Sequence, residues 1–178
     1  MIKKNKIAVV YRSKTGYTKE YATWLSQDLQ CDLLEENKIK ISDLLKFDTI
    51  IYGGGVYAST INGVGLITKN YSQLEGKNII IFAVGSSPVK EETIKQLQER
   101  NIPAMHRDKI KFFYLRGGFD INKLTGFNKF IMNIFIKKMN SDKKAAQNQN
   151  NQEESLDHPQ NYTDRVFLKP IIESAGVA

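Results

Sequence analysis

A chain of 178 residues, 41% of them hydrophobic, is long enough to bury the core of one ordinary domain, so we expect a single domain over 1–178. The only cysteine, Cys31, excludes an internal disulfide, and two distant histidines give no metal-ligand spacing, so no metal is expected. No stretch approaches the roughly 18 apolar residues of a membrane span, and the apolar run near the N-terminus is too short for a signal peptide. We therefore expect a cytoplasmic protein, or one held peripherally at the inner face of the cell membrane.

The positive charge is concentrated in one region. Residues 107–144 hold ten Lys or Arg against three Asp, so the whole net charge of +7 lies there. Such a region favours an anionic partner: nucleic acid, anionic lipid, an acidic protein or a carboxylate-bearing substrate. A solvated lysine-rich face is the alternative.

Five short runs rich in β-branched and aromatic residues predict strands. They cover 6–11, 31–36, 49–55, 78–85 and 109–115. Several are almost continuously apolar, which is typical of parallel strands covered on both faces by helices. The strand pattern of residues 31–36 is the weakest of the five.

Helical patterns separate these strands. We predict helices at 17–29, 41–45, 62–72 and 89–100, the last opened by Pro88. In the first, Tyr21, Trp24, Leu25 and Leu29 share one face. The alternation of strand and helix predicts an α/β fold, a three-layer doubly wound five-stranded parallel sheet that binds ligands beyond the carboxyl ends of its strands.

The pattern changes after the fifth strand. We treat 117–160 as an insertion and linker region, in which 141–160 is polar and low in complexity. A helical pattern then resumes, with Asn161 or Thr163 as its N-cap and Pro170 placed to kink or divide it.

Within the insertion, 127–139 predicts an extra apolar and basic helix. Its apolar residues cover most of the circumference and leave a narrow polar stripe. One interpretation is a helix buried against its own domain or a second subunit. The other is an interfacial helix that places basic residues on anionic lipid and its apolar arc in the acyl boundary.

A hydroxyl-rich stretch, "SKTGYT", lies between the first strand and the first helix. It consists of Ser13, Lys14, Thr15, Gly16, Tyr17 and Thr18. The helix start offers backbone N–H groups and the positive end of its dipole, and glycine lets an anion approach the backbone. The dinucleotide and nucleoside triphosphate motifs are absent. We therefore predict a monophosphate site, with an ordinary helix N-cap as the alternative.

The spacing [S/T]-x-T-G-x-T after a first strand resembles the FMN phosphate loop of flavodoxins, position by position at Ser13, Thr15, Gly16 and Thr18. The resemblance implies noncovalently bound FMN, with two further loops around the isoalloxazine ring and an aromatic residue stacked on it. The stretches "GGGVYASTING" (53–63) and "GSSPVKEE" (85–92) stand where those loops are expected.

From these loops the resemblance implies cofactor contacts at Gly53, Gly54, Gly55, Val56, Tyr57, Ala58, Gly85, Ser86 and Ser87. The glycines would allow close approach of the backbone to the ring, Tyr57 would stack, and Ser86 and Ser87 would donate to the ring edge. A plain strand-to-helix turn and an exposed loop aromatic are the alternatives.

The chain is basic, whereas flavodoxins are usually acidic. Residues 112–139 are similar in layout to the flavodoxin-like protoporphyrinogen IX dehydrogenases of bacteria, where a fifth strand runs into a Gly-Gly turn and an apolar, basic helix. That resemblance implies oxidation of protoporphyrinogen in heme biosynthesis through FMN, with electrons passed to a membrane quinone. The polar segment 141–160 does not map onto those enzymes.

The sequence thus leaves three functions open. The first is an FMN oxidoreductase of the protoporphyrinogen dehydrogenase type, in which the flavin carries the chemistry and no catalytic acid or base is needed. Arg116 is the candidate to bind a porphyrin carboxylate or the flavin, unless it forms a structural salt bridge with Asp120. The second is an electron carrier between redox proteins. The third is a basic binding module without flavin, although no nucleic-acid motif is present and no nucleic acid is expected.

Overall fold

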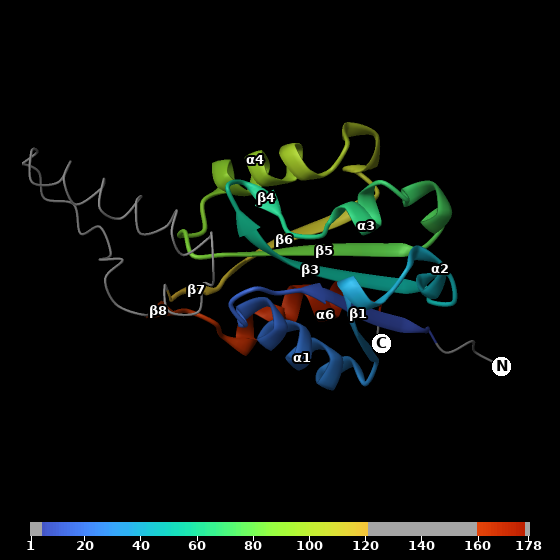
Figure 1. Cartoon of the computed structure of the whole chain (residues 1–178), viewed down its shortest axis with the longest axis horizontal. Coiled ribbons are helices and arrows are strands. Elements are labelled where there is room, and N and C mark those ends of the chain that lie inside the picture. Colours follow the sequence, from blue (N-terminus) through green and yellow to red (C-terminus); the bar gives the residue numbers. More distant parts are fainter. Residues whose placement is uncertain (1–4, 121–159, 177–178) are drawn as a thin grey trace, which may run out of the picture.

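The computed structural model describes residues 5–120 and 160–176, which are organised around a parallel β-sheet (Figure 1). Its strands run in the order β2-β1-β3-β5-β6, and the short β4 pairs antiparallel with the end of β3. They are β1 (Ile7–Arg12), β2 (Asp32–Glu35), β3 (Thr49–Tyr57), β4 (Thr60–Ile61), β5 (Asn78–Gly85) and β6 (Ile110–Arg116). The five predicted strands and the doubly wound flavodoxin-like fold class are confirmed.

The central strands are buried on both faces, which explains their continuous apolar sequences. In β3, Ile50 and Ile51 point to opposite faces, and both are fully buried. The edge strand β2 differs, since Leu33 there is 37% exposed. The weaker strand pattern of 31–36 therefore reflects its place at the edge of the sheet.

Helices cover the two faces (Figure 1). On one face lie α2 (Ile41–Leu44), α3 (Gly65–Thr68) and α4 (Glu91–Asn101), and on the other lie α1 (Tyr17–Leu29) and α6 (Lys169–Ser174). Tyr21 and Leu25 of α1 pack in the same core cluster as Phe82 of β5 and Leu168. Trp24 is only partly buried and packs edge-on against Tyr21, with ring centroids 5.6 Å apart.

Two predicted helices change their bounds. The predicted helix 62–72 is shorter at its start, because the Asn62 N–H still donates to the Gly55 carbonyl of β3 at 2.9 Å and Gly63 takes a positive φ of 74°. What remains is α3 and a 3-10 turn at Tyr71–Leu74. The helix predicted from residue 89 begins at Glu91, since its N-cap Lys90 is extended, with φ −133° and ψ 135°.

The two ends of the insertion lie side by side. Strand β7 (Gly118–Phe119) pairs antiparallel with β8 (Gln160–Asn161). The predicted extra helix at 127–139, and all of the polar segment 141–160 except Gln160, lie outside the described residues.

The final segment corrects one predicted cap. Neither Asn161 nor Thr163 caps it; the N-cap is Asp164, whose carboxylate accepts a hydrogen bond from the Val166 N–H. A 3-10 turn at Arg165–Leu168 precedes α6, in whose first turn Pro170 lies. Proline therefore divides this segment, because an α-helix tolerates it best near its start.

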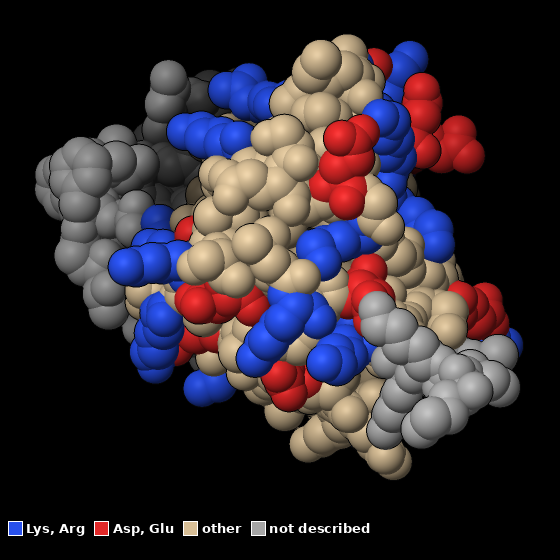
Figure 2. All heavy atoms as spheres, turned by 90° about the vertical axis from the view of Figure 1, so that its right-hand side faces the viewer, with Lys and Arg blue, Asp and Glu red and all other residues tan. Residues whose placement is uncertain are grey.

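In the described ranges, no helix has the length and apolar character needed to cross a membrane. Figure 2 views the end of the molecule that lies to the right in Figure 1, opposite the carboxyl ends of the strands. Basic and acidic side chains are interspersed over this face, so its described surface carries no patch of a single sign.

Candidate functional site

Three loops gather at one edge of the sheet. They follow β1, β3 and β5, and because these strands are parallel, their carboxyl ends meet at the left in Figure 1. The predicted cofactor residues of all three loops are thereby brought to the same end of the molecule. Arg116 ends β6 at this edge as well, opposite Gly85 in the register.

The loop after β1 folds on itself before α1 begins. Gly16 takes a left-handed conformation, with φ 97° and ψ −28°, and its N–H donates to Ser13 Oγ at 3.1 Å. The first intrahelical bond runs from the Glu20 N–H to the Gly16 carbonyl at 3.0 Å. The N-cap makes no side-chain hydrogen bond to the helix, so the N–H groups of the first turn stay directed at the loop.

The threonines of this loop face the end of β3. Thr18 is only 3% exposed, and its Oγ1 would lie 3.5 Å from a Cβ placed on Gly55. Thr15 is a side-chain hydrogen-bond partner of Tyr57. Tyr17 instead points away, since its ring packs beside Gly118 and its hydroxyl donates to the Gln160 carbonyl at 3.2 Å. Of the predicted cofactor contacts of Tyr17, only one through its backbone N–H is compatible with this position.

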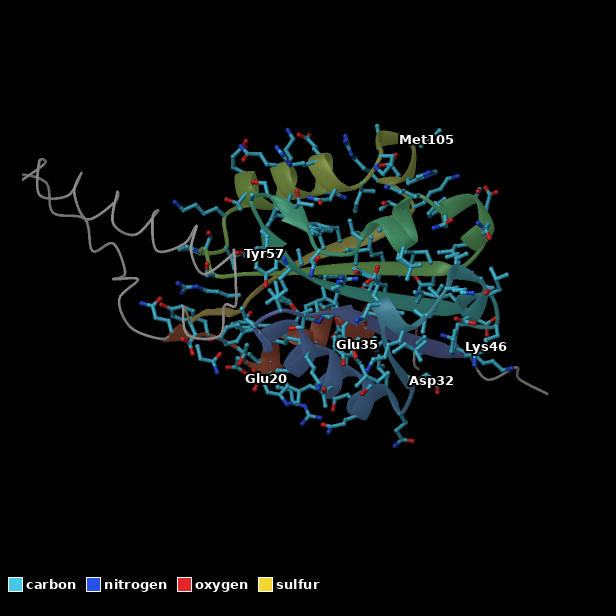
Figure 3. All side chains as sticks on the ribbon, viewed as in Figure 1. Glu20, Asp32, Glu35, Lys46, Tyr57 and Met105 are labelled. Carbon is cyan, nitrogen blue, oxygen red and sulfur yellow. The ribbon has the colours of Figure 1, made fainter. Side chains whose placement is uncertain are left out.

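Tyr57 ends β3 at the edge of the sheet where the three loops gather (Figure 3). The Lys14 ammonium sits 4.6 Å from the centroid of its ring, within the range of a cation–π contact. Burial raises the pKa of Tyr57, and the hydrogen bond with Thr15 opposes that rise. The ring is therefore packed on the loop, whereas the alternative of an exposed loop aromatic would leave it in solvent.

The three glycines of β3 have different neighbours. A Cβ on Gly53 would lie 2.1 Å from Phe82 Cζ, and one on Gly54 would lie 2.5 Å from Ile61 Cγ2. Gly53 and Gly54 are thus required by packing within the chain. A Cβ on Gly55 would lie 3.0 Å from Tyr57 Cε2 and 3.5 Å from Thr18 Oγ1, so of the three glycines this one lies against the loop after β1.

The end of β3 turns back as a hairpin. Val56 and Tyr57 pair with Ile61 and Thr60, and the turn between them passes through Ala58, which is exposed at its tip. This hairpin was not predicted, because the sequence "YAST" lacks the Asn-Gly or Asp-Gly that usually marks a two-residue turn.

The loop after β5 is fixed through its carbonyl groups. The Gly85 carbonyl accepts from the Gly117 N–H at 2.8 Å, and the Ser87 carbonyl accepts from the Tyr114 hydroxyl at 2.9 Å. Burial raises the pKa of Tyr114. A Cβ on Gly85 would lie 2.5 Å from the Tyr114 oxygen, so this glycine is required by the tyrosine beneath it.

Arg116 is held in place by the chain itself. Its Nε lies 3.4 Å from the Ser86 carbonyl, and its guanidinium stacks 3.6 Å from the centroid of the Tyr162 ring. Its own carbonyl accepts from the Tyr21 hydroxyl at 2.7 Å. Binding of a porphyrin carboxylate by Arg116 stays a prediction, and the stacking on Tyr162 is a contact that sequence spacing could not reveal.

A salt bridge at this edge was also missed by the sequence predictions. Arg12, the last residue of β1, forms a salt bridge with Glu36 just after β2. This contact raises the pKa of the Arg12 guanidinium, and Tyr52 lies next to both residues, its hydroxyl bonded to the Asn62 carbonyl at 2.7 Å. Among the described residues, no three His, Cys, Asp or Glu side chains gather as metal ligands do.

These features match the requirements of a phosphate group. A Cβ on Gly16 would meet no atom within 4 Å, so there is open space at the point where the loop turns into the helix. The Ser13 oxygen already accepts from Gly16, which leaves its own proton free to be donated outward. Hydroxyls and uncapped helix N–H groups around open space form a donor set suited to an anion.

A doubly wound sheet with three loops at its carboxyl edge, one of them a hydroxyl-rich helix start, places the chain in the class of doubly wound α/β proteins, whose ligands bind at that edge. Residues 8–147 match the family model of the flavodoxin domain, which is more than half of the chain. The chain therefore belongs to the flavodoxin-domain family. Proteins of this family typically bind FMN.

Solved structures of similar fold come from several bacteria. The Trp repressor binding protein of Bacillus subtilis has 20% identity and a TM-score of 0.47 over 63% of this chain and 83% of that one. The two-electron reduced flavodoxin of Megasphaera elsdenii has 14% identity and a TM-score of 0.45, over 62% and 85% of the two chains. Oxidised flavodoxin 2 of Bacillus cereus has 21% identity and a TM-score of 0.41, over 62% of this chain and 85% of that one. No protein of curated function matches the sequence.

The likeness to protoporphyrinogen dehydrogenases rests on residues 112–139. Residues 121–139 lie outside the described residues. The matching family model is that of the flavodoxin domain and is not specific to these dehydrogenases. The family match identifies a flavodoxin domain and does not point to a porphyrin substrate.

Proposed function

We propose that this protein binds FMN noncovalently and acts as an electron-transfer flavoprotein. The observation that carries the proposal is the uncapped start of α1, where Gly16 turns in open space and its N–H is bonded to Ser13 Oγ, with Thr15 and Thr18 in the same short stretch. A monophosphate gains charge-assisted hydrogen bonds and a favourable helix dipole at such a site.

The other two loops would hold the ring. Tyr57 offers an aromatic face directly beside the phosphate loop, and the loop at Gly85–Ser87 is fixed through its carbonyl groups to the end of β6. Rigid loops place a cofactor without a large ordering cost. The bound flavin would supply the redox chemistry, and the protein would supply orientation and electrostatics.

A narrower activity is the oxidation of protoporphyrinogen with a quinone as acceptor. It is supported by the basic and apolar character of 112–139, a composition that suits contact with anionic lipid and porphyrin propionates. An electron carrier with a redox protein as partner needs no such segment. The two activities differ in whether a small molecule reduces the bound flavin directly.

The first experiment is a titration of the apo-protein with FMN and, in parallel, with riboflavin, following flavin fluorescence. Riboflavin lacks the phosphate, so FMN should bind far more tightly. Equal binding of both flavins would contradict the phosphate site, and failure to bind FMN would overturn the proposed function.

The second experiment separates the two activities. The FMN-loaded protein is mixed anaerobically with protoporphyrinogen, then with a menaquinone analogue and anionic vesicles. We expect the flavin to stay oxidised, as for a carrier. Bleaching of the flavin with porphyrin formation sustained by the quinone would establish the dehydrogenase instead.

A further inference from the structure

The hairpin that carries Tyr57 turns through two residues that rarely adopt its backbone conformation. Ala58 has φ 46° and Ser59 has φ 61°, both in the left-handed region. Two-residue hairpin turns of this kind ordinarily use Asn, Asp or Gly at these positions, because a Cβ is disfavoured there. The turn therefore needs a stabilising contact from elsewhere in the chain.

Asn101 makes that contact from the last residue of α4. Its Oδ1 accepts from the Ile61 N–H at 2.8 Å, and its Nδ2 donates to the Ser59 carbonyl at 2.9 Å. The same Nδ2 donates to the Leu97 carbonyl of its own helix at 2.8 Å. One amide thus bonds both the turn, at Ser59, and strand β4, at Ile61, and fixes the hairpin to α4.

The residue just before this turn, Tyr57, contacts the loop after β1. The ring of Tyr57 lies 4.6 Å from Lys14 Nζ, and the Tyr57 side chain is hydrogen-bonded with Thr15. Tyr57 is paired with Thr60, so the strained turn directly sets where the tyrosine backbone lies. A group that fixes the turn also fixes the aromatic face beside the phosphate site.

We propose that Asn101 is a positioning residue for the flavin, acting through the hairpin to hold Tyr57 at the phosphate loop. This inference rests on the proposed function, since the ligand that Tyr57 would meet is FMN. Asn101 itself touches neither the phosphate loop nor Tyr57 in the contacts described above. Its effect is transmitted by the backbone of 58–61.

The first test measures FMN affinity in Asn101→Ala and, as a matched control, in Asn70→Ala. Asn70 Nδ2 donates to the Leu66 carbonyl four residues earlier at 3.0 Å, as Asn101 does to Leu97, but its side-chain hydrogen bonds are to Leu66 and Gln73 and not to the hairpin. We expect the dissociation constant to rise about tenfold in the first variant only, from the loss of two hydrogen bonds. Equal effects of both variants would overturn the inference.

A double-mutant cycle with Tyr57→Ala tests whether the effect passes through the tyrosine. If it does, Asn101→Ala changes FMN affinity in the wild-type background and leaves it unchanged when Tyr57 is absent. Additive losses would overturn the inference, because Asn101 would then act by another route.

A third test uses the apo-protein and a rescue. In Asn101→Ala, hydrogen exchange of the 56–61 backbone should accelerate while that of β5 stays the same. Adding Ala58→Asn and Ser59→Gly, which favour this turn intrinsically, should restore both protection and FMN affinity. Restored protection without restored affinity would overturn the inference. Failure of the wild-type protein to bind FMN would overturn the proposed function, whereas normal wild-type binding with an unaltered Asn101→Ala would overturn this inference alone.

Discussion

The loop after β1 and the hairpin after β3 reach the same site by different means. The loop is held by its own residues: Ser13 accepts from Gly16 three positions later, and glycine supplies the left-handed turn. The hairpin is held by Asn101, which is 40 residues from Ile61 and 42 from Ser59. A sequence motif can therefore predict the loop after β1. The hairpin after β3 depends on contacts between distant residues, which no local sequence pattern reveals.

Removing the hydroxyls of the local element should have the largest effect. In Thr15→Ala/Thr18→Ala we expect FMN affinity to fall about a hundredfold or more, because each hydrogen bond to a charged group contributes about 1.5–3 kcal/mol. The measurement is a fluorescence titration, with a circular dichroism spectrum to check the fold.

The matched control for this variant is Thr15→Ser/Thr18→Ser, which keeps both hydroxyls and should retain most of the affinity. An alanine variant that folds and binds FMN normally would show that the phosphate does not bind at this loop.

Glycine substitutions in the two regions should differ in their effect on the free energy of unfolding. Gly53→Ala would force a Cβ to within 2.1 Å of Phe82 Cζ, so we expect a loss of about 3 kcal/mol in the free energy of unfolding. Gly16→Ala meets no atom within 4 Å and is strained only by its φ of 97°, which costs about 1–2 kcal/mol. Urea unfolding of both variants measures the difference, and equal losses would contradict the packing argument.

Substitution of Arg116 tests whether the conformation of the loop after β5 also depends on contacts between distant residues. Arg116→Ala removes the stacking on Tyr162 and the contact with the Ser86 carbonyl. We expect a loss of about 1 kcal/mol in the free energy of unfolding, together with faster hydrogen exchange at 85–87.

Arg116→Lys should not restore these properties, since an ammonium cannot stack as a planar guanidinium does. Full recovery with lysine would indicate that only the positive charge at this position matters.

The smallest effect should come from relieving the hairpin. Ala58→Gly removes the Cβ that disfavours a φ of 46° and should raise the free energy of unfolding by up to about 1 kcal/mol, offset in part by the flexibility of glycine when unfolded. Thermal unfolding measures it. A lowered melting temperature would show that the turn carries no strain.

The sequence predicted the fold well, for identifiable reasons, and the three loops predicted to bind the cofactor do meet at one edge of the sheet. Continuous apolar runs marked the buried strands, and the period of Tyr21, Leu25 and Leu29 marked α1 within its observed bounds. The predictions failed where pairing between segments decides the conformation. The predicted helix 62–72 lost its first residues because the pairing with β3 continues to Asn62, whose N–H donates to the Gly55 carbonyl at 2.9 Å.

The sequence by itself determined the doubly wound sheet and the hydroxyl-rich start of α1, because hydrophobic periodicity and short-range hydrogen bonding are local properties. Only the tertiary structure decided that Gly53 makes room for Phe82, that Arg116 stacks on Tyr162, and that Asn101 fixes the turn beside Tyr57. These contacts join residues far apart in the chain, and their geometry exists only once the helices and strands are packed together.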